Sequence, residues 1–561
     1  MRRPRALGRA TAAAVALATT LGAASLAPGP AADPRPAASV APSTTSAAGT
    51  SEYTVLIDDA GSRDAAVAAV EAAGGRVVRE NGAVGALVVE APAAGFVERV
   101  TAADGVFGAT HARPVGATTA SRARVAAPPQ GASGTGGTRR VQGPAGLDPL
   151  DTKLWGLSMI NAAEVRAHQD GDPRVLVGIL DTGVDASHPD LAPNFDAELS
   201  RNFVTDIPTD PTGGVLDGPC EFEGCVDPVG HDGGGHGTHV AGTVAAAANG
   251  SGLSGVAPGV TLVNIRAGQD AGLFFLQPVV DALTYGADAG LDVINMSFYV
   301  DPWRYNCLDN PADSPEARIE QRTIIEAVTR ALEYAHGRGV TLVGSLGNEN
   351  EDLGLPATDT SSPNHPPGSA YERPIDNASC FDLPVEGPHV IGVSALGSSG
   401  EKAAYSNYGV EQISLAAPGG GGAGVADGIL STYPQAILQR EGAVDERGEV
   451  TPQGAATGVQ RVCAGSACGY YTYLRGTSMA APHVTGAAAL VVSERGTPDP
   501  QRPGQLTMDP AAVERALVES AAAHACPVPP SATARCEGTP EFNGHYGHGI
   551  LDVAAAVATA P

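Results

Sequence analysis

The sequence predicts an α/β protein in which a parallel sheet with helices on both faces follows a small α+β unit. From about residue 147, short strands that are apolar throughout alternate with helical segments. This pattern is typical of a parallel sheet that is covered on both faces. Before it, residues 52–113 show strands and helices in the order β-α-β-β-α-β. The chain has 561 residues, more than one average domain, so we expect two or more structural units.

The order of elements in the N-terminal unit is that of a ferredoxin-like fold. Its first helix is indicated by Val67 and Val70, which lie three residues apart, and it ends at the pair Gly74-Gly75. The expected elements are a strand at 53–57, a helix at 64–73, strands at 76–79 and 85–89, a helix at 96–103 and a strand at 105–110.

The second unit begins with a continuous apolar run that ends in Asp181. We expect strands at 175–180, 261–265, 292–296, 340–343 and 389–393, with helices at 239–248, 278–289, 319–336 and 479–492. Each strand is followed by a helix or by another apolar strand, so the elements form βαβ units and a parallel sheet.

The N-terminus has the features of a secretory signal peptide. Four arginines within the first nine residues precede a stretch of apolar or small residues at 10–27. We place the signal peptide at 1–32 and a flexible Pro- and Ala-rich spacer at 33–51, and we interpret the Gly- and Pro-rich residues 114–146 as an exposed linker. No later stretch of about 18 charge-free apolar residues occurs, so we expect a secreted protein without a membrane anchor.

Charge and cysteine content narrow the functional classes. The net charge is −27, which argues against a nucleic-acid partner because such a partner requires a basic surface. The eight cysteines agree with export. Many pairings are possible, and nearest neighbours are the simplest: Cys220 with Cys225, Cys463 with Cys468 and Cys526 with Cys536, which leaves Cys307 and Cys380. A cysteine metal site is the alternative, but no C-x-x-C repeat with zinc spacing occurs.

Three polar segments interrupt the apolar pattern of the second unit. They are LDTGVDASHPDL at 180–191, GHGTHVAGT at 235–243 and GTSMAAPHVTG at 476–486. Asp181 follows a buried strand, where open α/β sheets place their ligands. Ser478 begins a helix, where unpaired N–H groups and the helix dipole favour developing negative charge. His236 also lies at the start of a helix.

Each of these residues has a simpler interpretation when taken alone. Asp181 could belong to a turn, and Ser478 could be a helix cap. His236 could be a cap or a core residue, or could bind zinc together with His239, although their spacing without a glutamate is not the H-E-x-x-H pattern. The three residues together follow the chain order Asp, His, Ser, which is one of the orders found in serine triads.

The three segments resemble the motifs of the subtilisin-like serine proteases, or subtilases, over roughly residues 150–561. The resemblance implies a subtilisin-like fold for residues 147–561, which act as a monomer on protein or peptide substrates through an acyl-enzyme. Ser478 would be the nucleophile, His236 its base and Asp181 the residue that orients the base. Asn348, next to Gly347, matches the family's side-chain donor to the oxyanion.

Residues 52–113 are similar to the inhibitory prodomain of the same family. The resemblance implies that this unit inhibits its own enzyme until the enzyme removes it, with a cut in 111–150 and preferably between His111 and Arg124. A stable accessory domain is the alternative. Two other functions stay open, namely a narrow-specificity processing peptidase and a catalytically silent binding protein with the same fold.

The sequence departs from the family at one wall of the substrate pocket. VINMS at 293–297 matches the strand that leads into this wall, but Phe298, Tyr299 and Val300 stand where a Gly-Gly pair commonly follows. With Ser297 and Gly347, these residues are the expected pocket residues. We expect the bulky side chains to reshape the pocket, so that broad cleavage after large apolar residues is lost. An outward loop that leaves the pocket unchanged is the alternative.

The resemblance also implies a structural calcium ion, although the chemistry requires no cofactor. Asp190 and Asn249 match side-chain ligand positions of the family. The backbone carbonyls of Ala247, Ser251 and Leu253 could complete the oxygen shell that Ca²⁺ prefers. An ordinary Gly-rich turn at 245–255 is the alternative.

Overall fold

The computed structural model describes residues 50–58, 61–112, 121–122, 148–166, 168–209, 213–300, 302–365, 368–528 and 534–558. These residues belong to one compact unit of the chain, Gly49–Pro561. The predicted signal peptide, the spacer and most of the linker lie outside the described residues, so those assignments stay predictions. Among the described helices, none is long and apolar enough to cross a membrane.

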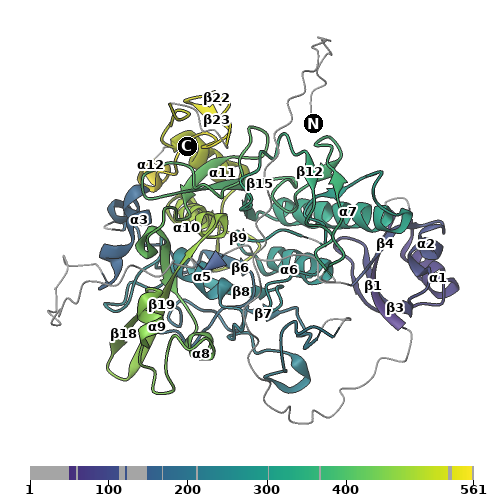
Figure 1. Cartoon of the computed structure of the whole chain (residues 1–561), viewed down its shortest axis with the longest axis horizontal. Coiled ribbons are helices and arrows are strands. Elements are labelled where there is room, and N and C mark those ends of the chain that lie inside the picture. Colours follow the sequence, from purple (N-terminus) through teal and green to yellow (C-terminus); the bar gives the residue numbers. More distant parts are fainter. Residues whose placement is uncertain are drawn as a thin grey trace, which may run out of the picture. The chain divides into compact units, whose positions relative to one another are not determined.

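The N-terminal unit is a four-stranded antiparallel sheet with the strand order β2-β3-β1-β4 (Figure 1, purple). Its elements are β1 (Thr50–Ile57), α1 (Arg63–Ala72), β2 (Arg76–Asn81), β3 (Ala86–Pro92), α2 (Phe96–Thr101) and β4 (Val106–His111). This order and pairing confirm the βαββαβ prediction. Tyr53 and Val55 of β1 pack with Val70 of α1 and Phe96 of α2 in one core.

The other face of this sheet packs on two helices of the second unit, α6 (Leu276–Ala289) and α7 (Pro315–Gly337). Leu56 and Ala86 belong to the same hydrophobic cluster as Val280 of α6 and Ile324 of α7. Leu56 follows Val55 along β1 and therefore points to the opposite face, because side chains alternate along a strand. The central strands β1 and β3 are thus buried on both faces over most of their length, whereas the edge strand β2 is largely exposed.

The second unit is built on a seven-stranded sheet in which every pair of neighbouring strands is parallel, as predicted. The strand order is β16-β15-β11-β9-β6-β8-β7. The strands are β6 (Leu176–Leu180), β7 (Arg201–Asn202), β8 (Thr261–Arg266), β9 (Val293–Met296), β11 (Thr341–Ser345), β15 (Val390–Leu396) and β16 (Leu415–Pro418). The chain leaves β6 towards β8 on one side and then returns to β9 on the other, which makes the end of β6 a topological switch point.

Helices cover both faces of this sheet (Figure 1). Val177 and Ile179 of β6 pack in the cluster that contains α5 (His236–Ala245) and α10 (Thr477–Arg495). Leu176 and Leu180 pack in the cluster that contains α6 and α7. The alternation along β6 follows from the two-residue period of a strand, and it explains why a strand between two helical layers is apolar throughout.

The remaining elements surround this framework. They are β5 (Ser121–Arg122), η1 (Asp151–Lys153), α3 (Trp155–Met159), α4 (Ala162–Val165), η2 (Glu223–Cys225), β10 (Asn306–Cys307), β12 (Thr358–Asp359), β13 (Arg373–Pro374), β14 (Cys380–Phe381), η3 (Val425–Asp427), β17 (Ile429–Thr432), α8 (Gln435–Arg440), α9 (Pro452–Ala456), β18 (Gln460–Ala464), β19 (Ala467–Arg475), β20 (Thr497–Pro498), β21 (Leu506–Thr507), α11 (Pro510–Ser520), β22 (Gly538–Thr539), β23 (Phe542–Asn543) and α12 (Val553–Ala558).

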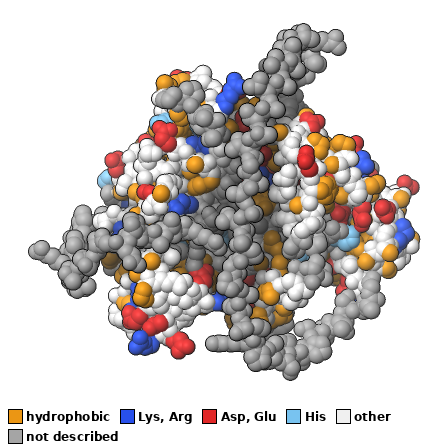
Figure 2. All heavy atoms as spheres, viewed as in Figure 1, with side chains coloured by type: hydrophobic (Ala, Val, Ile, Leu, Met, Phe, Trp, Pro, Cys, Tyr) orange, Lys and Arg blue, Asp and Glu red, His pale blue; other side chains and the backbone are white. Residues whose placement is uncertain are grey.

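Disulfides join the three predicted close pairs and also the two remaining cysteines, Cys307 and Cys380. The nearest-neighbour prediction is therefore confirmed. Acidic side chains lie at many separate places on the face shown in Figure 2, which agrees with a net charge that serves solubility.

Candidate active site

Asp181 lies directly after β6 and is fully buried. The backbone N–H groups of Ala267 and Gly268, which follow β8, donate to its carbonyl oxygen at 3.1 Å. Its carboxylate atom Oδ1 accepts the backbone N–H of Thr182 at 2.8 Å. The residue is therefore held at the switch point of the sheet by backbone contacts from the neighbouring strand.

His236 is the first residue of α5, and its Nδ1 lies 2.7 Å from Oδ1 of Asp181. Since a carboxylate only accepts hydrogen bonds, Nδ1 carries a proton in this contact, so that in the neutral tautomer the lone pair lies at Nε2. Nε2 is buried and has no hydrogen-bond partner among the described residues. The close approach of α5 to Asp181 requires glycine at 237, because a Cβ there would lie 2.1 Å from the carbonyl oxygen of Gly183.

His239 points away from this pair. Its Nε2 donates to the carbonyl oxygens of Ile429 and Thr472, at 3.0 Å and 3.2 Å. Burial, with a smaller contribution from His236, lowers the pKa of His239 to about 3, so the ring is neutral. The two histidines thus serve different partners, and the geometry opposes a shared zinc site.

Ser478 is the second residue of α10 and is fully buried. Its hydroxyl donates to the carbonyl oxygen of Ser297 at 3.2 Å, and the Ser297 hydroxyl donates to the carbonyl oxygen of Ser478 at 3.0 Å. Helices α5 and α10 pack against each other. In this conformation the hydroxyl is directed to Ser297, and Nε2 of His236 makes no hydrogen bond with it.

Asn348 follows β11 and lies against the start of α10. Its Oδ1 accepts the backbone N–H of Thr477 at 2.8 Å and the Thr477 hydroxyl at 3.1 Å. The N–H of Gly347 in turn donates to the Thr477 hydroxyl at 3.0 Å. Because Oδ1 is held by Thr477, the side-chain NH₂ of Asn348 is directed away from that residue, as a donor to an oxyanion beside Ser478 must be.

Residues 172–549 match the sequence model described as the subtilase family, Peptidase_S8. The chain belongs to the subtilase family. Among its relatives, subtilisin DY of Bacillus licheniformis is 29% identical over 346 residues, which are 62% of this chain and 86% of that protein. Fervidolysin of Fervidobacterium pennivorans is 28% identical over 356 residues, which are 62% of this chain and 38% of that protein.

Solved structures share the subtilase fold. The epidermin leader peptide processing serine protease EpiP from Staphylococcus aureus superposes with a TM-score of 0.58 at 21% identity, over 92% of this chain and all of that one. The crystal structure of fervidolysin, described as a keratinolytic enzyme, superposes with a TM-score of 0.57 at 22% identity, over 92% of this chain and 62% of that one.

The pocket wall of this subtilase differs from the expectation. The ring of Phe298 stacks on that of Phe274, with centroids 4.1 Å apart and planes 7° apart. Phe298 and Val300 are both buried in the cluster that contains α6 and α7. Core packing therefore takes up two of the three bulky side chains that we expected to narrow the pocket, and only Tyr299, which is half-buried, stays outside that core.

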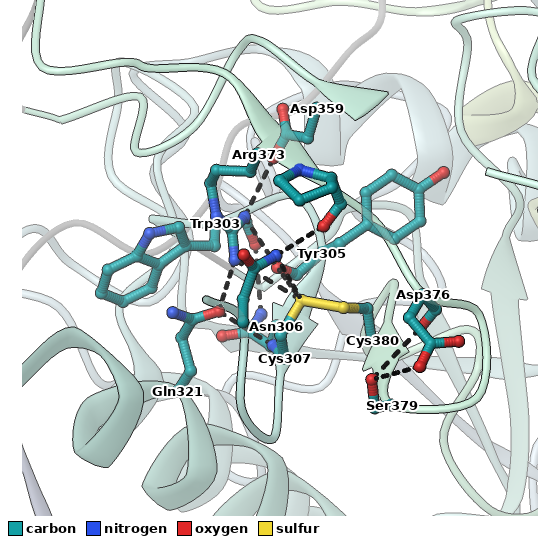
Figure 3. Close-up of a disulfide and its surroundings, with 12 residues drawn as sticks. Trp303, Tyr305, Asn306, Cys307, Gln321, Asp359, Arg373, Asp376, Ser379 and Cys380 are labelled. Atoms are coloured by element: carbon teal, nitrogen blue, oxygen red, sulfur yellow. Dashed lines mark hydrogen bonds and ion pairs between the residues drawn. A yellow bond between two sulfur atoms is a disulfide. The ribbon is translucent and has the colours of Figure 1, made fainter. Parts of the chain in front are cut away.

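Residues 302–316 form an insert after the pocket wall, and the Cys307–Cys380 disulfide anchors it (Figure 3). The buried Arg373 beside it pairs with Asp313 and with Asp359. The insert also reaches the catalytic region, because Arg304 pairs with Glu349 at 3.0 Å, and Glu349 directly follows Asn348. Sequence reasoning missed this pair, because the insert carries no recognisable motif.

The residues expected to bind calcium do not fit a cation as they are arranged. Asp190 is fully buried, and hydrogen-bond donors surround its carboxylate. Oδ2 accepts from the Tyr471 hydroxyl at 2.7 Å and from the backbone N–H of Leu253 at 3.1 Å, and Oδ1 accepts from Nδ2 of Asn249 at 3.1 Å. The backbone N–H of Ala247 donates to the Asp190 carbonyl at 2.7 Å.

Hydrogen-bond donors of the protein stabilise the negative charge of the Asp190 carboxylate, which is the role that a metal ion would otherwise have. An N–H group has no lone pair for a cation, the Tyr471 hydroxyl directs its hydrogen at the carboxylate, and Oδ1 of Asn249 already accepts the backbone N–H of Ser251. Next to this loop, the guanidinium of Arg166 donates to Asp151 and to the carbonyl oxygen of Ser254. Neither Tyr471 nor Arg166 lies in a motif that would have identified its role.

Proposed function

We propose that this subtilase is a secreted serine endopeptidase that is made as a self-processing zymogen. The observation that carries the proposal is the 2.7 Å contact between Asp181 and His236, which leaves Nε2 of His236 buried and without a partner on α5, the helix that packs against α10 and its Ser478. A buried imidazole in this tautomer can act as a general base, whereas a core histidine satisfied on both nitrogens cannot.

The chemistry would proceed by acyl transfer. The Ser478 hydroxyl attacks the carbonyl carbon of the scissile peptide bond while Nε2 of His236 takes its proton. The imidazolium that forms is stabilised by the Asp181 carboxylate and passes the proton to the leaving amine. Water then attacks the acyl-enzyme by the same steps in reverse. The side-chain amide of Asn348 and the backbone N–H of Ser478 would bind the oxyanion in both halves of the reaction.

Zymogen processing is supported by the way the N-terminal sheet is held. Thr54 donates to Gln277 of α6 at 3.0 Å, and the side chain and backbone N–H of His111 both contact Glu320 of α7. Ten residues later, β5 pairs with β19 at Arg475, three residues before Ser478. A chain that is fastened at 111 and again beside the nucleophile is suited to a cut between these points, as expected from the sequence.

A narrow processing peptidase is the second candidate. Arg304 ties the insert to Glu349, directly after the oxyanion residue, and such a contact can restrict the substrates that reach it. It shares the mechanism of the first candidate and differs in substrate. A peptide-library profile distinguishes the two, since a broad endopeptidase cleaves many sequences and a processing enzyme cleaves few.

The central test is covalent labelling. A fluorophosphonate should modify the mature protein at Ser478, and Ser478→Ala should abolish both labelling and peptidase activity. Sequencing the N-terminus of the secreted protein should show a start after His111. An unlabelled, correctly folded protein would support the catalytically silent alternative, and a mature start before residue 100 would contradict self-processing.

A further inference from the structure

A row of polar side chains crosses the otherwise apolar layer between β9 and α10. Asn295 of β9 and Ser297, which follows β9, are both fully buried. Val293 of β9 packs in the cluster that contains α5 and α10. Since side chains alternate along a strand, Asn295 points to the same face as Val293. On α10 it meets Thr485, which is also fully buried.

Three hydrogen bonds connect these side chains to the backbone of Ser478. The Thr485 hydroxyl donates to Oδ1 of Asn295 at 3.0 Å. Nδ2 of Asn295 donates to the Ser297 hydroxyl at 2.8 Å. That hydroxyl in turn donates to the carbonyl oxygen of Ser478 at 3.0 Å. The chain of bonds therefore starts on α10, passes through the end of β9 and returns to the first turn of α10.

The carbonyl oxygen of Ser478 needs such a donor because of Pro482. In an α-helix this oxygen accepts the backbone N–H four residues further on, which is position 482 in α10. Proline has no N–H, so Pro482 leaves the Ser478 carbonyl without its helical donor. The Ser297 hydroxyl supplies a donor from outside the helix. The first turn of α10 is thus held by a side chain of another element, at the residue that carries the nucleophile.

We propose that Asn295, Ser297 and Thr485 are positioning residues for the nucleophile. They fix the backbone of Ser478, and through it the directions of its hydroxyl and of the N–H that would bind the oxyanion. This inference rests on the proposed peptidase function, since it concerns the same serine. The hydroxyl of Ser297, an expected pocket residue, serves the helix in this role.

Hydrogen bonds suit this role better than apolar contacts do. Apolar packing is non-directional, so it holds α10 on the sheet without fixing how far the helix slides or turns. Hydrogen bonds weaken steeply when their angles change, so they fix both. Ser297 and Ser478 bond in both directions, since the Ser478 hydroxyl donates to the carbonyl oxygen of Ser297 at 3.2 Å. A displacement of the nucleophile by about 1 Å can cost about 10²-fold in rate.

The test uses two threonines at equivalent places. Thr485 of α10 lies seven residues after the proposed nucleophile, and Thr243 of α5 lies seven residues after the proposed base. Thr485→Val removes the donor to Asn295 and keeps the shape of the side chain, whereas Thr485→Ser keeps the hydroxyl. Thr243→Val is the matched control, because the buried Thr243 hydroxyl donates to the carbonyl oxygen of His239 within its own helix.

Each variant is made in the full-length chain and assayed after the N-terminal unit has been removed. The rate of fluorophosphonate labelling, kcat and KM for a peptide substrate, and the melting temperature are measured, with all rates taken well below the lowest melting temperature. Ser297→Ala is a second variant, which removes the donor to the Ser478 carbonyl directly and decides the test if Thr485→Val does not fold.

We expect Thr485→Val and Ser297→Ala each to lower kcat and the labelling rate about tenfold or more, with KM within about twofold of the parent. Thr485→Ser and Thr243→Val should stay within about twofold in all three, although Thr243→Val also loses a buried hydroxyl. Combining Thr485→Val with Ser297→Ala should add little to Ser297→Ala alone, because both break one chain of bonds.

The proposal is overturned if Thr485→Val and Thr485→Ser have equal rates, if Thr243→Val loses as much rate as Thr485→Val, or if the loss falls on KM. In each of these cases a parent protein that is labelled at Ser478 still supports the proposed function. A correctly folded parent that is not labelled refutes the proposed function and this inference together.

Discussion

The contact between the N-terminal sheet and α6 can be tested by substitution of Asp281. This side chain is 8% exposed and binds two residues of β2. It pairs with Arg79, and its Oδ1 accepts Nδ2 of Asn81 at 2.8 Å. We expect Asp281→Ala to weaken the hold on the N-terminal sheet without affecting the proposed catalytic residues.

The expected loss of binding free energy between the N-terminal unit and the rest of the protein follows from these two contacts. Arg79 is 52% exposed, so its pair with Asp281 contributes about 1 kcal/mol. The hydrogen bond from Asn81 to a carboxylate contributes about 1.5 kcal/mol. The second bond of Asn81, to Thr284, survives the substitution. A loss of about 2–3 kcal/mol corresponds to an affinity that is about 30- to 150-fold weaker.

The assay uses the Ser478→Ala protein with a foreign protease site in the linker. After the linker is cut, the concentration at which the N-terminal unit dissociates is measured by dilution and size-exclusion chromatography. Arg79→Ala should add little to Asp281→Ala, because the two share one contact. Asp288→Ala is the matched control, since Asp288 lies on the same helix but bonds to Tyr334 of α7. If Asp281→Ala has less than about a threefold effect, or no more than the control, the reasoning is refuted.

Three further predictions concern single side chains. Asn348→Ala should lower kcat about 10²–10³-fold with KM little changed, because the lost hydrogen bond stabilises the oxyanion and not the bound substrate. Steady-state kinetics measures both constants, and an equally large rise in KM would contradict the prediction. Tyr471→Phe should lower the free energy of unfolding by about 1–3 kcal/mol, because it removes a donor to the buried Asp190. Urea titration measures this change, and an unchanged free energy would contradict the prediction. Burial raises the pKa of Asp292 to about 7, above its unfolded value, so the folded state binds the proton more tightly and stability falls as pH rises from about 4 to 7. Asp292→Asn should retain the hydrogen bond from the N–H of Leu176. As the pH rises through this range, the melting temperature of the parent should fall relative to that of the variant, and parallel pH profiles would refute the raised pKa of Asp292.

Much of the framework was predictable because its signals are local. The apolar strand before Asp181 and the glycine-flanked starts of α5 and α10 follow from turn chemistry and from the periods of strand and helix. Close cysteine pairs were predictable for the same reason, since a short loop brings their sulfurs together. The predicted start of α5 was less accurate. The helix begins at 236 and not at 239, because its first turn is capped by Asp232, four residues before the helix.

The pocket and the expected calcium site were not predictable in the same way. Phe298 and Phe274 lie in the segments that follow two different strands, β9 and β8, so their stacking depends on how those segments meet. The donors to Asp190 come partly from Tyr471, which is 281 residues away along the chain. Sequence spacing carries no information about such a contact, so a matching calcium motif did not reveal that its carboxylate was already satisfied.

The sequence by itself determined the family, the order of the elements and the residue types available for acyl transfer, because these depend on short patterns that survive without knowledge of packing. Only the tertiary structure decided the environment of each group. It directed His236 to Asp181 and His239 to β17 and β19, and it brought the Ser297 hydroxyl to the carbonyl oxygen of Ser478. The physical reason is that burial and charge balance are properties of neighbours in space, and most of those neighbours are distant in the chain.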